Sequence, residues 1–397
     1  MHRPAPSRRG FLLTTAGAGA ALGLGPGLVA AGPAVAGTRP HPRPRPFGRY
    51  GSPAARRTPK TLYVDPHGRG DFTSVQAAVD AAEGDGWTLV LAPGTYRETV
   101  AVDAGRTGAT WIGASGDPRD VVIVHDNAAG TPKPDGSGTY GTSGSATTTV
   151  RADGFTAHAL TFANDWLRAD QPDWTGTQAV AVKVMGDRSA FHDCRFLGHQ
   201  DTLYADSRDL GLFARQYYER CYVEGDVDFV FGRATAVYEH CHFRTLVRTD
   251  LDAAPYGFVF APSTAGANPR GYLVIRGRVS SEAPDGYYKL ARPWVPSSDT
   301  TARPMLTVRE THLGAGVDAV APYADMRDAH PWQEQRFREY RNSGPGAAIG
   351  VPENRPQLTR AEAAAHTREA YLGDWRPYDW RPYDRRPNDR QPYDGRR

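Results

Sequence analysis

Brief runs of apolar and β-branched residues, separated by turn residues, make up most of the middle of the chain. Such runs lie at 88–92, 121–125 and 305–308, and each is too short for an ordinary helix. One stretch, 72–83, instead spaces its apolar residues three and four apart, as the buried face of a helix requires. The pattern therefore predicts a mostly β protein with one short helix near its beginning.

Three segments repeat one frame: an aromatic residue, two further residues, a cysteine, one residue and an apolar residue. The copies are 191–196, 218–223 and 238–243, and their cysteines are 27 and 20 residues apart. Repeats of this length typically stack into a solenoid, because no single repeat can bury its own apolar face. We predict an all-β fold, a right-handed parallel β-helix with a short N-terminal helix and long loops on one face.

Residues 1–36 have the composition of an export signal. A twin-arginine core at 7–12 precedes a Gly/Ala/Leu-rich stretch, and 34–36 have the small side chains of a cleavage site. An uncleaved hydrophobic anchor is the alternative, which the density of Gly and Pro disfavours. The Pro/Arg-rich residues 37–60 are typical of a linker. We expect a secreted, extracellular protein with no membrane association once the signal is removed.

A five-residue pattern, Trp-Arg-Pro-Tyr-Asp, repeats with decreasing fidelity from Trp375 to Asp394. Proline at every fifth position excludes a regular helix or a central strand. We expect 374–397 to be a disordered low-complexity tail, and an arm that binds polysaccharide through its Tyr and Trp rings is the alternative. The folded domain is then 61–373.

Charge is segregated along the 397 residues, although the formal net charge is only +3. Of the 47 Lys and Arg residues, ten lie in 1–60 and seven in 375–397, whereas these ends hold only four of the 44 Asp and Glu residues. The remaining chain, 61–374, has 30 basic and 40 acidic side chains. A part this acidic is not suited to nucleic acid, because binding phosphates requires a basic face.

The repeated frame also makes a prediction about cysteine pairing. Coils stacked at strand spacing, about 4.8 Å, bring successive cysteines within the distance that a disulfide needs. An exported protein meets an oxidising compartment. We therefore expect a Cys221–Cys241 disulfide and a buried free thiol at Cys194. Three reduced cysteines in the core are the alternative.

Two aspartates occupy the same place in successive copies of the frame. Asp201 lies seven residues after Cys194, and Asp228 lies seven residues after Cys221, so the two should be stacked on neighbouring coils. An aspartate within the run Val-Asp-Phe-Val-Phe is costly to bury unless it is paired or catalytic. Two close carboxyl groups cannot both ionise freely, which yields one acid and one base or nucleophile. A structural alternative is that both cap coil turns.

Other polar and aromatic residues are candidates for the same site. Gln178 lies 22 residues before Gln200, about one coil, and their amides are placed to donate to a developing oxyanion. Arg292 is a fixed cation that can hold a carboxylate with two hydrogen bonds, or else forms a surface ion pair. Three aromatic residues are candidates to line a sugar-binding groove, although each can equally belong to the core: Tyr204, Phe231 and Trp294.

Several common catalytic motifs are absent from the sequence. It contains no His-Glu-x-x-His, no pair of cysteines at zinc spacing, no phosphate-binding loop and no evident carboxylate cluster for calcium. It also lacks a Gly-x-Ser-x-Gly elbow, which disfavours a serine hydrolase. The paired aspartates therefore remain the principal candidate for chemistry.

Five blocks occur in an order that identifies a family resemblance. The third and fourth blocks are the most specific, and they read Gly-His-Gln-Asp-Thr-Leu-Tyr and Gly-Asp-Val-Asp-Phe-Val-Phe-Gly. With all five blocks taken together, the chain resembles the pectin methylesterase (pectinesterase) family, of the bacterial exported type. The blocks lie at 94–98, 178–180, 198–204, 225–232 and 290–294.

The resemblance implies a β-helical catalytic domain that hydrolyses methyl esters of homogalacturonan, without metal or organic cofactor. In the matching positions, Asp228 is the nucleophile and Asp201 the general acid and base. Gln178 and Gln200 hold the oxyanion, and Arg292 orients Asp228. Pectin is the implied partner, and a monomer is the default expectation.

The resemblance also assigns residues around this centre. Trp294 and Phe231 shape the subsites, and Thr142 matches a substrate-contacting turn of bacterial members. Cys221 and Cys241 match a disulfide of bacterial members. One departure is Ala291, which stands where glycine usually precedes the arginine.

Three other functions remain as alternatives. A related esterase or thioesterase on the same scaffold would act on another ester. A pectate lyase or polygalacturonase would share the β-helix but needs a calcium site or an Asp-rich set that the sequence does not show. A non-catalytic pectin-binding β-helix would make the paired aspartates, the two glutamines and the arginine coincidental.

Overall fold

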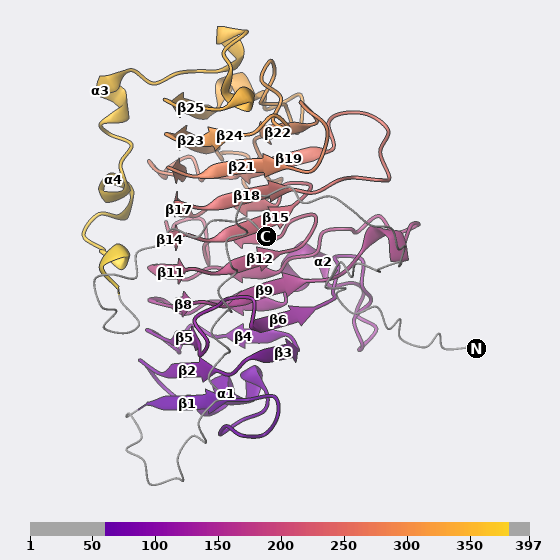
Figure 1. Ribbon diagram of the computed structural model, residues 1–397, viewed down its shortest axis with the longest axis vertical. Helices are drawn as coiled ribbons and strands as arrows, with labels where there is room; N and C mark the ends of the chain where they lie inside the picture. The colour runs from indigo at the N-terminus through magenta and orange to yellow at the C-terminus, as the bar shows by residue number, and fades with distance from the viewer. Residues whose placement is uncertain (1–59, 381–397) are drawn as a thin grey trace, which may run out of the picture. The chain divides into compact units, whose positions relative to one another are not determined.

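The computed structural model describes residues 60–380, which form three long parallel sheets. Strands from successive turns of the chain pair side by side, so the sheets run along a right-handed parallel β-helix, as predicted (Figure 1). The ten-strand sheet contains β1 (Thr61–Val64), β2 (Thr88–Leu91), β5 (Thr110–Gly113), β8 (Thr156–His158), β11 (Ser189–His192), β14 (Arg215–Glu219), β17 (Thr235–Glu239), β20 (Tyr272–Ile275), β23 (Met305–Arg309) and β25 (Arg336–Tyr340). The eight-strand sheet contains β3 (Gly94–Arg97), β6 (Val121–His125), β9 (Thr161–Asn164), β12 (Arg195–Leu197), β15 (Tyr222–Gly225), β18 (His242–Thr245), β21 (Arg278–Ser281) and β24 (His312–Leu313). The seven-strand sheet contains β4 (Val100–Val102), β7 (Thr148–Val150), β10 (Val182–Val184), β13 (Leu203–Ala205), β16 (Val230–Gly232), β19 (Gly257–Pro262) and β22 (Tyr288–Ala291).

The repeated sequence frame corresponds to one corner of the coil. Phe191 pairs with Tyr218 and Tyr218 with Tyr238 along the ten-strand sheet, and their stacked rings fill the interior. The residue directly before each cysteine has a positive φ, for example 52° at Arg220 and 55° at His240. One left-handed residue thus turns the chain from the ten-strand sheet into the eight-strand sheet, which explains why the frame is so compact.

The predicted Cys221–Cys241 disulfide is not formed in the structure, where all three cysteines are buried free thiols. The Sγ of Cys221 lies 3.4 Å from the carbonyl oxygen of Phe191, and the Sγ of Cys241 lies 3.3 Å from that of Tyr218. Both thiols therefore donate toward the preceding coil in the same direction. The thiol of Cys221 also interacts with those of Cys194 and Cys241, but no bond joins them, so the structure has three reduced core cysteines, as in the alternative.

Helix α1 (Val75–Ala81) covers the N-terminal end of the solenoid and is shorter than the predicted 72–83 (Figure 1). Ser74 caps it by accepting a hydrogen bond from the Ala77 amide at 3.2 Å. Glu98 accepts hydrogen bonds from two further amides of the first turn, so the helix begins at a satisfied end. The other helical segments are α2 (Gly141–Gly144), η1 (Arg168–Asp170), η2 (Trp332–Glu334), η3 (Pro345–Ala347), η4 (Pro352–Asn354), α3 (Arg360–Ala363), α4 (Arg368–Leu372) and η5 (Pro377–Asp379).

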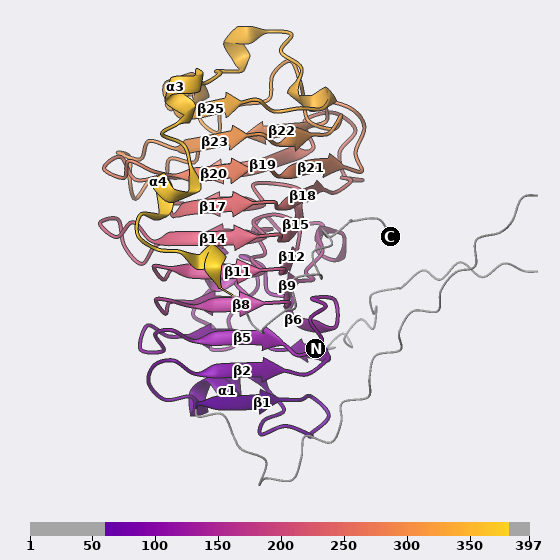
Figure 2. The same cartoon turned by 60° about the vertical axis from the view of Figure 1, so that its left-hand side comes forward.

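The C-terminal segment returns along the outer face of the ten-strand sheet, where α4 contacts β14 and β17 (Figure 2). Tyr371 and Leu372 are buried there, and Trp375 and Tyr378 pack against the same apolar cluster. The ring of Trp380 stacks on that of His192. The ordered chain therefore continues past the expected boundary at 373, through the first copy of the five-residue pattern.

The predicted export signal, most of the predicted linker and the rest of the tail lie outside the described residues. Within residues 60–380, no helix is both long enough and apolar enough to cross a membrane.

Candidate active site

The two aspartates of the repeated frame lie one coil apart, as the sequence predicts. Each precedes a strand of the seven-strand sheet by two residues, Asp201 before β13 and Asp228 before β16, and Leu203 pairs with Val230. The amide of Asp201 donates to the carbonyl oxygen of Val227 at 3.0 Å, which joins the two turns directly. Both aspartates have a positive φ, 66° at Asp201 and 50° at Asp228, which is a rarely populated backbone conformation for a residue other than glycine.

Gly225 allows these turns to approach each other. A Cβ at this position would lie 2.5 Å from the carbonyl oxygen of His199 and 2.3 Å from the Cβ of Phe229. A side chain at 225 would therefore push the turn of Asp228 away from that of Asp201.

Arg292, which directly follows β22, forms a two-point ion pair with Asp228. Its Nε donates to Asp228 Oδ1 at 2.8 Å and its Nη2 donates to Oδ2 at 2.6 Å. The guanidinium also lies over the ring of Phe258, 3.9 Å from the centroid, which fixes its plane. This is the two-point geometry in which arginine holds a carboxylate most firmly.

The surroundings act differently on the pKa values of the two carboxyl groups. Asp201 and Asp228 are 7% and 6% exposed, so burial raises the pKa of each. The negative charge of Asp228 raises the pKa of Asp201 further, well above its ordinary value. At Asp228 the hydrogen bonds and charge of Arg292 oppose the effect of burial on the pKa. The pKa of Asp228 is raised overall but less than that of Asp201, so the proton of the pair is favoured on Asp201 and the negative charge on Asp228.

A second ion pair beside the aspartates was not predicted. Arg168 donates to both oxygens of Asp226, at 2.7 and 2.8 Å, and Asp226 is 1% exposed. Nδ1 of His199 lies 3.2 Å from the same carboxylate. Burial raises the pKa of Asp226, but the hydrogen bonds from Arg168 and His199 outweigh it and hold the pKa far below its usual range. The signal was the first aspartate of Gly-Asp-Val-Asp, which is Asp226, but nothing in the sequence points to Arg168 as its partner.

The three predicted groove aromatics form one cluster next to the aspartates. Tyr204 and Phe231 are paired on β13 and β16, and their rings stack with centroids 4.1 Å apart. The ring of Trp294 lies 5.6 Å from that of Phe231 and is only partly buried. Trp294 is therefore the member with a face left for a ligand, whereas Tyr204 and Phe231 are mostly core.

The glutamines lie on adjacent coils, as their spacing predicts. The carbonyl oxygen of Gln200 accepts a hydrogen bond from the amide of Ala179, next to Gln178, at 3.0 Å. The side-chain oxygen of Gln200 accepts from Thr177 Oγ1 at 2.7 Å, which leaves its amide nitrogen as a donor. Both side chains are partly exposed.

Thr142 lies in the short helix α2, in the connection between β6 and β7. Ser143 of the same turn accepts a hydrogen bond from Lys183 Nζ at 2.7 Å, and this ammonium lies over the Tyr204 ring, 4.6 Å from its centroid. The turn is thereby tied to the aromatic cluster.

No three His, Cys, Asp or Glu side chains between residues 60 and 380 are grouped so that they would hold a metal ion.

Comparisons with known proteins show to which family the chain belongs. The Pectinesterase family model matches residues 61–375. Pectinesterase 31 of Arabidopsis thaliana is 32% identical over 327 residues, which cover 79% of this chain and 93% of that protein. A pectinesterase of Ralstonia solanacearum is 31% identical and covers 76% of this chain and 83% of its own length.

Solved structures give the same result. A pectin methylesterase in complex with hexasaccharide VII superposes with a TM-score of 0.71 at 29% identity, covering 79% of this chain and 97% of that one. Pectin methylesterase PemA from Erwinia chrysanthemi gives a TM-score of 0.70 at 29% identity, with coverages of 81% and 99%. With a family model matched along almost the whole solenoid, the chain belongs to the pectinesterase family.

Proposed function

We propose that the chain hydrolyses methyl esters of homogalacturonan (pectin) to pectate and methanol, with Asp228 as nucleophile and Asp201 as general acid and base. The observation that carries the proposal is the asymmetry of two buried, stacked carboxyl groups, of which Arg292 grips one. Such an arrangement supplies a carboxylate and a carboxylic acid at the same pH.

In the first half-reaction, an oxygen of Asp228 attacks the C6 carbonyl carbon of a methyl-esterified residue. The C–O bond to the methoxy group breaks, and Asp201 gives its proton to the departing methanol. The product is an anhydride between Asp228 and the sugar carboxyl, and Asp201 is now ionised.

In the second half-reaction, Asp201 takes a proton from a water molecule that attacks the sugar carbonyl of the anhydride. The anhydride bond breaks, which releases the galacturonate carboxyl and regenerates the Asp228 carboxylate. Arg292 orients Asp228 and favours its departure as an anion. The cycle consumes one water per ester and uses only side chains of this chain.

The remaining residues bind and position the substrate. The amides of Gln178 and Gln200 donate to the oxyanion that develops on the carbonyl oxygen. Trp294 offers a partly exposed ring to the sugar. Phe231 and Tyr204 support that ring from beneath, and Thr142 contacts the chain from the α2 turn.

Residues 1–36 are proposed to direct export of the protein to the outside of the cell, where pectin is found. The catalytic candidates all come from one chain, which is consistent with a monomer.

The test is methanol release from highly methylated pectin, with EDTA present. We expect release by the full chain, a loss of at least about 10³-fold in Asp228→Asn, and no unsaturated uronides. Asp80→Asn, which neutralises an exposed aspartate on α1, is the matched control and should retain full activity. A folded wild type that releases no methanol but cleaves another acyl ester would replace this proposal by a related esterase or thioesterase. If the wild type and Asp228→Asn bind pectin equally and neither hydrolyses it, the protein would be a binding module.

A further inference from the structure

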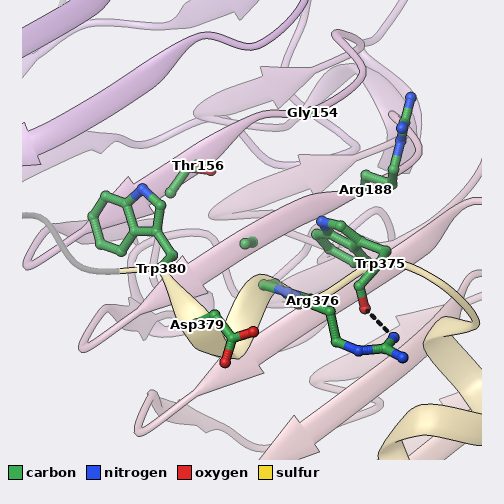
Figure 3. A pocket seen from close by; sticks show the side chains of 9 residues that line it. Gly154, Thr156, Arg188, Trp375, Arg376, Asp379 and Trp380 are labelled. Carbon is green, nitrogen blue, oxygen red and sulfur yellow. Dashed lines mark hydrogen bonds between the residues drawn. The ribbon is translucent and has the colours of Figure 1, made fainter.

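A cavity of about 520 Å³ lies between the first copy of the Trp-Arg-Pro-Tyr-Asp pattern and the ten-strand sheet. Its floor comes from the beginnings of β8 and β11, at Thr156 and Ala190, and its outer wall comes from residues 375–380 (Figure 3). The catalytic aspartates precede strands of the seven-strand sheet, so this cavity belongs to a different face of the solenoid.

Two indole rings bracket the cavity, Trp375 at one end and Trp380 at the other (Figure 3). The Trp380 ring stacks on His192 with centroids 4.9 Å apart and an interplanar angle of 15°. Trp375 packs against the apolar cluster around Tyr217. Trp380 also packs against His158, with ring centroids 5.6 Å apart. Both indole rings remain partly exposed, and the buried Pro377 lies between them in the chain.

Arg188 and Arg376 also line the cavity near Trp375, and their guanidinium groups extend outward from the space between the two indole rings (Figure 3). Arg188 is 53% exposed, and its carboxylate neighbour Asp187, 3.5 Å away, already accepts two hydrogen bonds from the side chain of Arg215. Arg376 is also exposed and donates through Nη1 to the backbone carbonyl oxygens of Gly373 and Trp375. Most of the donors of both groups thus remain for a ligand.

Among the described residues that line the cavity, Asp379 is the sole carboxylate. Two cations against one anion favour a ligand with negative charge, and the single carboxylate can accept hydrogen bonds from hydroxyl groups.

We infer that this cavity binds a uronate-bearing oligosaccharide, as a second saccharide site away from the catalytic centre. The flat indole faces suit the C–H faces of sugar rings, and the guanidinium groups suit their carboxylates. The choice of a galacturonate chain among carboxylate-bearing sugars rests on the proposed function. The site would keep the enzyme attached to the de-esterified product while the catalytic centre works on esterified segments.

The test measures binding of fully de-esterified hexagalacturonate to the full chain by calorimetry, with neutral galactohexaose as the comparison ligand. Wild type should bind the uronate at two sites. Arg188→Gln/Arg376→Gln should keep its fold, and the affinity of the second site for the uronate should be at least about tenfold weaker, so that one site is lost from the titration. The matched control is Arg278→Gln/Arg360→Gln, which removes two exposed arginines elsewhere on the chain and should bind as wild type does.

Equal uronate stoichiometry and affinity in Arg188→Gln/Arg376→Gln and wild type would overturn the inference. Equally tight binding of the neutral hexasaccharide would overturn carboxylate recognition. Methanol release from a short methylated oligosaccharide should be the same in all three proteins. Loss of one binding site in a protein that never releases methanol would refute the proposed function and leave the saccharide site standing.

Discussion

Arg292 offers two donors to the two oxygens of Asp228, at 2.8 and 2.6 Å, across a separation of 64 residues in the chain. Asp201, one coil away, is equally buried but lies outside this two-point grip. A single arginine therefore favours the ionised form of Asp228 over that of Asp201.

Replacing Arg292 tests this division of roles. Arg292→Lys keeps a positive charge but loses the planar two-point contact, so the pKa of Asp228 should rise and its ionised fraction fall. We expect kcat/KM for methanol release to fall by about 10- to 100-fold, with the acidic limb of the pH profile moved to higher pH. Arg292→Ala should fall further. An unchanged acidic limb in Arg292→Lys would mean that the arginine does not control Asp228.

Asp201→Asn removes the proton donor and the base. Activity should fall by about 10²- to 10⁴-fold, while the Asp228–Arg292 pair stays intact. Burial and the charge of Asp228 hold the pKa of Asp201 well above its ordinary value of 3.8 in the folded protein. The neutral carboxyl therefore contributes stability that is present below that value and is lost as pH rises through the raised pKa.

Asp201→Asn abolishes this pH-dependent loss. The melting temperature of the variant relative to wild type should therefore increase from about pH 4 to about pH 8, as measured by calorimetry. A difference that does not change over this range would show that Asp201 is not held neutral by its surroundings.

The Arg168–Asp226 pair should be a structural support of the site. Asp226→Asn leaves the guanidinium of Arg168 without its anion, and we expect a loss of about 3–5 kcal/mol in the free energy of unfolding. The double variant Arg168→Met/Asp226→Asn removes both charges and should recover part of that loss. Denaturant titration of the single and double variants measures the coupling, and additive effects would contradict a paired role.

Trp294 should contribute to substrate binding more than to chemistry. Trp294→Ala removes the partly exposed ring over Phe231, so KM should rise by about three- to tenfold while kcat changes little. Trp294→Phe keeps an aromatic face and serves as the conservative control. A fall in kcat with unchanged KM would instead place Trp294 in the positioning of the reacting groups.

The three thiols should be free in the purified protein. Alkylation after unfolding without reductant should modify Cys194, Cys221 and Cys241, which mass spectrometry counts directly. Modification of only one cysteine would restore the disulfide that the repeated frame first suggested.

The sequence by itself determined the coil and the position of its paired aspartates. The aromatic-x-x-Cys frame repeats once per coil, so equal offsets in sequence become stacked positions in space, as with Asp201 and Asp228. The family motifs added Arg292, which no local periodicity connects to Asp228. Helix α1 was recognised because its apolar spacing is local, although the cap at Ser74 makes the helix begin at Val75, later than the pattern predicts.

Only the tertiary structure decided the contacts between segments that share no frame. Arg168 pairs with Asp226, 58 residues away in the chain. The ring of Trp380, from a tail with a low-complexity sequence, stacks on that of His192. The cysteines make a related point, because stacking brings the thiols of neighbouring coils together but does not decide whether they are bonded. Periodic patterns record neighbours within and between repeats, whereas ion pairs and ring stacks between distant segments depend on side-chain directions that exist only after the chain has folded.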